Sequence, residues 1–133
     1  MVLRPLKGFG AFESAVRTGR RVTVGPLSLT VGKSTLGSGH AEDTLCYGVS
    51  VPKRVAKSAV VRNRIKRLLR ESLRRVLTDH EEQCRVAGIT TIVTIWREAP
   101  ESASLIGLHD VLPVVEKAIV KGIQRISQPA GPA

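Results

Sequence analysis

A dense cluster of basic residues in the middle of the chain is its clearest chemical feature. Between Pro52 and Arg75 the sequence holds seven arginines, three lysines and a single acid, Glu71, which gives this segment a net charge of +9 against +10 for the whole chain. The basic residues are Lys53, Arg54, Lys57, Arg62, Arg64, Lys66, Arg67, Arg70, Arg74 and Arg75. Solubility alone does not require such concentration. Arginine pairs with phosphate and stacks on bases, so we expect a nucleic acid partner.

Residues that could act as catalysts or metal ligands are few and scattered. Cys46 and Cys84 form no CxxC pair and have no histidine at zinc-finger spacing, so structural zinc is not expected. The acids form no cluster at metal-binding spacing, and Glu71 is expected to pair with Arg67 or Arg75 at i, i+4. We therefore expect no catalytic residue, no metal ligand and no nuclease activity in the protein alone.

The basic residues lie on a predicted amphipathic helix from about Ser58 to Thr78. A core-facing stripe follows the 3.6-residue period and consists of Val61, Ile65, Leu68, Leu69, Ser72, Leu73 and Val76. Arg62 falls at the border of this stripe, and Asn63 lies among the cations on the polar side. That side repels itself unless an anion neutralises it.

The flanking segments predict the elements that position this helix. They are a helix over 6–18, a strand over 21–33 with a possible break at Gly25-Pro26, a hairpin loop over 33–43, a strand over 44–51, a polar connection over 79–88, a strand over 89–96 and a helix over 109–126. Strand, long helix and strand in this order indicate a parallel β-α-β crossover through the basic helix. The chain therefore predicts one α+β domain over 1–127 and a disordered tail over 128–133.

Composition limits where the protein works. The chain has 133 residues, 42% of them hydrophobic, which is enough to bury a core. No apolar run approaches the ~20 residues needed to cross a bilayer, and the start lacks the apolar stretch of a signal peptide. We expect a cytoplasmic protein with no membrane partner.

Two runs of residues resemble the protein subunit of bacterial ribonuclease P. The first run spans 47–54, and the second, 59–71, holds Arg62-Asn63-Arg64 followed by Ile65 and further basic residues. The spacing of Leu6, Phe12 and Gly19 also resembles the family through its first helix and the turn after it. The resemblance covers about residues 6–126.

This resemblance implies both a fold and a role. The implied fold is α-β-β-β-α-β-α, of the ribosomal-protein-S5-domain-2-like kind. The implied role is that of the RNA-binding subunit of an endoribonuclease that removes the 5′ leader of precursor tRNA. The catalytic centre and its Mg²⁺ are then expected in the RNA subunit, with no cofactor bound by the protein. The implied partners are the catalytic RNA and the precursor tRNA leader, with no obligatory protein partner.

The resemblance also implies two sets of site residues. Docking on the RNA subunit is expected from Lys53, Arg54, Lys57, Arg62, Asn63, Arg64, Lys66, Arg67 and Arg70. A leader-binding cleft between the first helix and the sheet is expected to involve Phe9, Phe12, Val16 and Arg17. The chain departs from the family at Val16, where a second aromatic is common, at Ala56, where glycine is common, and in the strand over 27–31, which lacks an aromatic residue. The sequence leaves open whether Phe9 and Phe12 line the cleft or belong to the core.

A ribosomal-type or generic nucleic-acid-binding protein is the alternative. A basic helix could enter a major groove, and the fold class is shared with ribosomal domains. The full pattern around Arg62-Asn63-Arg64 favours the ribonuclease P reading, because a generic binder does not require it.

Overall fold

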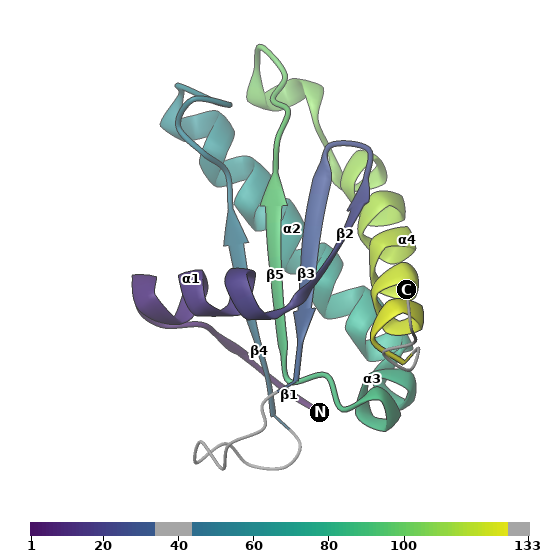
Figure 1. Ribbon diagram of the computed structural model, residues 1–133. Coiled ribbons are helices and arrows are strands. Elements are labelled where there is room, and N and C mark those ends of the chain that lie inside the picture. The colour runs from purple at the N-terminus through teal and green to yellow at the C-terminus, as the bar shows by residue number, and fades with distance from the viewer. Residues whose placement is uncertain (34–43, 128–133) are drawn as a thin grey trace.

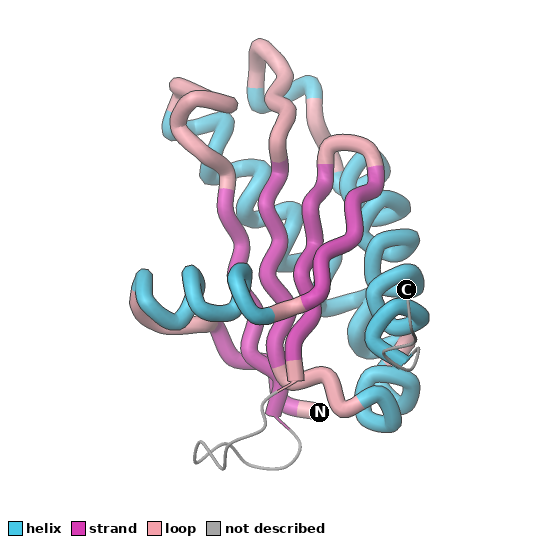
Figure 2. Tube along the Cα trace, in the orientation of Figure 1, coloured by secondary structure: helices cyan, strands magenta, loops and turns pink. Residues whose placement is uncertain are grey.

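Five strands form one mixed sheet that carries helices on both faces (Figures 1 and 2). The computed structural model describes residues 1–33 and 44–127. The strands are β1 (Val2–Pro5), β2 (Arg20–Val24), β3 (Leu27–Gly32), β4 (Thr44–Ser50) and β5 (Thr91–Trp96), in the spatial order β1-β4-β5-β3-β2. The pairs β1–β4 and β4–β5 are parallel, and β5–β3 and β3–β2 are antiparallel.

The helices divide into two layers. Helix α1 (Phe9–Thr18) crosses one face of the sheet, while α2 (Ala59–Asp79) and α4 (Leu108–Ser127) pack side by side on the other face (Figure 1). The short helix α3 (Glu81–Ala87) follows α2, and a 3-10 turn, η1 (Ala103–Leu105), precedes α4. Figure 2 shows α1 lying across the strands.

The predicted α+β class and the crossover are confirmed. The chain runs from β4 through α2 and α3 into β5, and β4 and β5 are adjacent parallel strands. The predicted break at Gly25-Pro26 is the turn between β2 and β3, where Gly25 adopts φ +54°.

The predicted order of elements lacked β1 and α3. Helix α3 occupies the segment where a polar connection was expected. The sequence did not reveal this helix because only Cys84 and Ala87 of its seven residues are buried. The expected hairpin loop over 33–43 lies, apart from Lys33, outside the described residues, as does the tail over 128–133.

The two faces of the sheet differ in chemistry. The face under α2 and α4 carries the core, whose fully buried members include Leu27, Leu29, Val31, Leu45, Ile92, Ile65, Leu69, Leu73, Val115 and Ile119. Because strand residues alternate between faces, the face under α1 presents the intervening positions. Those positions are small and partly polar: Ser28 and Thr30 on β3, Val93 on β5, and Gly48 on β4.

Gly19 sets how closely the end of α1 approaches the sheet. Gly19 follows the helix with φ −83° and ψ 176°, a conformation that any residue can adopt. Space is the constraint. A Cβ at Gly19 would lie 2.5 Å from Cγ2 of Thr30, 2.7 Å from the carbonyl oxygen of Val31 and 2.9 Å from that of Ala15. Two of these atoms belong to the backbone and cannot move aside.

We therefore expect Gly19→Ala to destabilise the fold by about 1–3 kcal/mol, as overpacking does. Gly10→Ala is the matched control in the same helix, because a Cβ there meets no atom within 4 Å. That control should be neutral or stabilising by up to about 1 kcal/mol, since alanine favours the helix. Thermal unfolding of both variants measures the difference. Equal melting temperatures for the two variants would contradict the steric account.

Candidate RNA interface

Helix α2 forms where its sequence pattern placed it. Ser58 caps the N-terminus by accepting a hydrogen bond from the amide of Val61 at 3.4 Å, and the apolar stripe is buried from Val61 to Leu77. Leu68 is only partly buried. The opposite side of the helix is exposed and basic. The stripe and the charged side therefore occupy separate faces, as expected.

Arg62 is tied to the segment that leads into the helix. Its Nη1 donates hydrogen bonds to the carbonyl oxygens of Ala56 at 2.7 Å and of Lys57 at 2.9 Å. The side chain is half-buried at the border of the apolar stripe, and Ala56 is buried. Arg62 thereby fixes the approach segment 53–58 against α2, while its Nε and Nη2 remain available for an external acceptor.

Arg64 makes a second link to the backbone, on the other side of the helix. Its Nε donates to the carbonyl oxygen of Ile106 at 2.9 Å, which joins α2 to the segment following η1. Ile106 is itself buried. Arg62 and Arg64 thus each bind the backbone of a loop next to α2. The sequence alone did not predict either contact.

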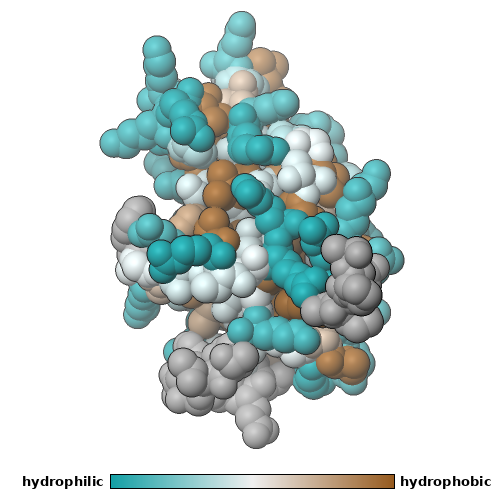
Figure 3. All heavy atoms as spheres, in the orientation of Figure 1, coloured by the Kyte–Doolittle hydropathy of each residue, from teal (hydrophilic) through white to brown (hydrophobic). Residues whose placement is uncertain are grey.

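The other basic positions form a set of free cations. In the described parts of the chain, no hydrogen bond or ion pair engages the side chains of Lys53, Arg54, Lys57, Lys66, Arg67 and Arg70, and we call these six the free cations. All are exposed except Lys66, which is half-buried. Asn63 is also exposed. Hydrophilic side chains project at the end of the molecule where the approach segment lies (Figure 3).

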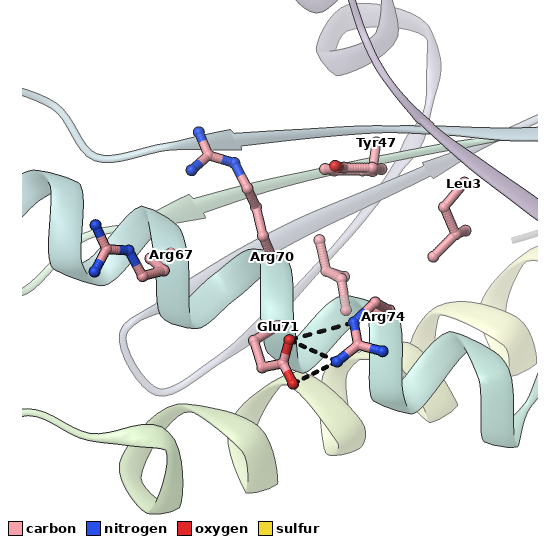
Figure 4. A pocket seen from close by; sticks show the side chains of 7 residues that line it. Leu3, Tyr47, Arg67, Arg70, Glu71 and Arg74 are labelled. Carbon is pink, nitrogen blue, oxygen red and sulfur yellow. Dashed lines mark hydrogen bonds and ion pairs between the residues drawn. The ribbon is translucent and has the colours of Figure 1, made fainter.

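The positive charge in the C-terminal part of α2 is partly compensated by an acid of the same helix. Glu71 pairs with Arg74 at 2.6 Å and with Arg75 at 2.9 Å, and the first pair is drawn in Figure 4. The expectation that Glu71 pairs with Arg67 or Arg75 is confirmed by the pair with Arg75, and the additional pair with Arg74 was not expected. Hydrogen bonds from Arg74 and Arg75 lower the pKa of Glu71 below its usual value. Uncompensated charge is therefore concentrated in the first half of the helix and its approach.

The expected leader-binding residues lie on α1. Phe12 is half-buried, and its ring packs on Gly48 of β4: a Cβ at that glycine would lie 3.0 Å from Cδ2 and 3.1 Å from Cε2. Val16 is also half-buried, whereas Arg17 is exposed in the last turn. Phe9 begins the helix, but its side chain lies outside what the structure describes. Phe12 is thus packed on the sheet but not fully buried.

The cysteines are buried and reduced. Burial raises the pKa of the Cys84 thiol to about 11, which keeps it protonated at neutral pH. Cys46 lies on β4, where its amide donates to the carbonyl oxygen of Thr90, and Cys84 lies on helix α3; both thiols are free. Within residues 1–33 and 44–127, no three side chains of His, Cys, Asp or Glu gather as metal ligands would.

Sequence reasoning missed one feature next to the free cations. Tyr47 of β4 and Leu3 of β1 line a pocket with Arg67, Arg70 and Arg74 of α2 (Figure 4). The sequence placed Tyr47 in a strand and at the start of the run that resembles the family, but assigned no role to its side chain. The pocket depends on β1, which the sequence did not predict, so no pattern in the sequence could have found it.

Comparison with known proteins decides the family. The family model for ribonuclease P matches residues 4–112, which is most of the chain and includes the whole of α2. The chain belongs to the ribonuclease P protein family. Membership assigns it to the protein component of a tRNA-processing ribonucleoprotein endonuclease, with the ribonuclease P RNA as its partner. A search among curated proteins finds no match.

Solved structures show the same fold. The ribonuclease P protein of Staphylococcus aureus superposes with a TM-score of 0.62 at 21% identity, covering 90% of this chain and 96% of that one. A mutant of the same protein, described as defective in mRNA degradation, gives a TM-score of 0.60 at 21% identity, covering 88% and 86%. The fold expected of a ribonuclease P protein is thus confirmed. No helix among the described residues has the length and apolar character to span a membrane.

Proposed function

We propose that this ribonuclease P protein docks on the ribonuclease P RNA through the free cations and Arg62-Asn63-Arg64. The supporting observation is the uneven pairing along α2: Glu71 pairs with Arg74 and Arg75, while the six free cations, which precede it in the chain, are exposed apart from the half-buried Lys66. An RNA backbone supplies the missing negative charge, and charge-assisted bonds to phosphate oxygens are the strong ones. Arg62 and Arg64 preorganise the surface by fixing the loops on either side of α2.

The same proposal assigns catalysis to the RNA partner and leader binding to the opposite face of the protein. Mg²⁺ held by the RNA would supply the hydrolytic chemistry. The precursor tRNA leader would lie between α1 and the sheet, where Phe12 offers a partly exposed ring above small residues such as Gly48 and Thr30. A single strand suits such a surface, because stacking and charge tolerate any sequence.

We expect docking on the ribonuclease P RNA to weaken steeply with salt. If the six free cations each neutralise one phosphate, the affinity should fall roughly 10³-fold between 50 and 200 mM monovalent salt. Titration of the purified protein with the RNA subunit at several salt concentrations measures this slope. A flat response would contradict docking through the basic surface.

Reconstitution separates this role from the generic alternative. The protein should stimulate cleavage of precursor tRNA by the RNA subunit at low magnesium, and it should show no cleavage without that RNA. Equal affinity for ribonuclease P RNA, ribosomal RNA and duplex DNA at matched salt would favour a generic binder. Cleavage by the RNA-free protein would refute the assignment of catalysis to the RNA.

A further inference from the structure

A pocket of about 310 Å³ opens between the sheet and helix α2, next to the free cations. Its walls come from three elements that are far apart in sequence: Leu3 on β1, Tyr47 on β4, and five residues of α2. Figure 4 shows Tyr47 and Leu3 on the sheet side and the arginines rising from the helix opposite them. Arg70 extends from the helix toward the strand that carries Tyr47.

The polar side of this pocket carries unbalanced positive charge. Arg67 and Arg70 line it, and neither is engaged by another side chain of the described segments. Arg74 lines it too, but Glu71 holds that guanidinium through three hydrogen bonds of 2.6–3.2 Å. An anion entering the pocket therefore meets two guanidiniums that no other described side chain engages, and the one carboxylate in the lining is already paired with arginines.

The inner side of the pocket is aromatic and apolar. Tyr47 is half-buried, and within the described residues its hydroxyl has no hydrogen-bond partner. Leu3 and Leu73 complete the apolar lining. Figure 4 views the Tyr47 ring edge-on, so one of its faces is turned toward the helix and the space between. An aromatic face beside free guanidiniums offers one surface to a base and another to a phosphate.

We propose that this pocket takes a single unpaired nucleotide of the RNA that docks on α2, with its base on Tyr47 and its phosphate on Arg67 and Arg70. The inference rests on the docking role proposed above and names the chemistry of one position within it. A paired base cannot enter, because it is stacked inside a helix, whereas a bulged or loop nucleotide can be turned outward. Arg67 and Arg70 belong to the free cations, so the backbone path along α2 leads directly to the pocket.

Substitution of Tyr47 distinguishes stacking from charge. Tyr47→Leu should weaken docking on the ribonuclease P RNA roughly 5- to 100-fold, with the slope of log affinity against log salt unchanged. Tyr47→Phe keeps the ring and should stay within about threefold of the parent protein. Arg70→Ala should instead reduce the salt slope by about one. Unchanged affinity for Tyr47→Leu, or an equal loss for Tyr47→Phe, would overturn the stacked base.

The parent protein offers a test that needs no variant. Tyr47 is the only tyrosine in the chain, so nitration by tetranitromethane reports on this ring alone among tyrosines. Bound RNA subunit should slow nitration several-fold, and an undiminished rate in the saturated complex would overturn the proposal. Loss of all salt-dependent RNA binding by the parent protein would instead refute the docking role itself. Protection of Tyr47 together with full affinity of Tyr47→Leu would show a covered but empty pocket, which also rejects the proposal.

Discussion

Replacing Arg62 by alanine is expected to weaken docking on the ribonuclease P RNA by roughly 1.5–3 kcal/mol, or about 10- to 150-fold. The loss has two sources. One is a charged donor at the RNA surface. The other is the pair of bonds that Nη1 makes to the carbonyl oxygens of Ala56 and Lys57, which fix the approach segment. Without them the segment that carries three of the free cations must be ordered at the moment of binding, and that ordering costs affinity.

Two further variants identify which source dominates. Arg62→Lys keeps the charge but not the planar fork, so it should restore the salt slope and only part of the affinity. Arg75→Ala removes a cation of the same helix that is already paired with Glu71, and its effect should stay within about threefold. Filter binding or calorimetry at several salt concentrations compares the affinity and the salt slope of the three variants. Similar losses for Arg62→Ala and Arg75→Ala would mean that position on the helix does not matter.

Phe12→Ala is expected to impair binding of leader-bearing substrate while leaving docking on the RNA subunit intact. Stacking of a base on an aromatic ring is worth roughly 1–3 kcal/mol, so the preference of the holoenzyme for precursor over mature tRNA should fall about 5- to 150-fold. Phe12 suits this role because its ring rests on Gly48 with one edge and stays half exposed. Dissociation constants for precursor and mature tRNA measure the effect.

The control for Phe12 separates the ring from its packing. Phe12→Leu retains an apolar contact with Gly48 but presents no aromatic face, so it should lose leader preference nearly as far as alanine does. Full leader binding by the leucine variant would show that packing alone matters. If docking, leader binding and the melting temperature all fall together, Phe12 belongs to the structural core.

Much of the fold could be predicted because long elements leave periodic patterns. Helix α2 repeats its apolar spacing over 21 residues and begins at a serine cap, so both its faces and its start could be read from the sequence. Strand β1 could not, because four residues that end in proline carry too little pattern and their partner, β4, lies some forty positions away. Helix α3 was hidden for a similar reason, since only two of its seven residues are buried.

The candidate site, like the fold, could be predicted only in part from the sequence. Charge is a property of residue types, so the sequence located the basic cluster. The anchoring of Arg62 and Arg64 could not be predicted, because their acceptors are backbone carbonyls, which every residue possesses. The split between neutralised and free cations depends on which arginines Glu71 reaches, and the helix permits several choices at i+3 and i+4. The assignment of the free cations and Arg62-Asn63-Arg64 to RNA contact, and of Phe9, Phe12, Val16 and Arg17 to leader contact, stays a prediction.

The free cations also couple the folding of this protein to its partner. Like charges held on one surface raise the free energy of the native state, so added salt should favour folding even as it weakens docking. RNA that binds only the native protein pulls the folding equilibrium forward by mass action, by about 2.7 kcal/mol when its concentration is a hundred times the dissociation constant. Assembly and folding are in this sense linked equilibria, and the abundance of the RNA sets how much of the protein is folded.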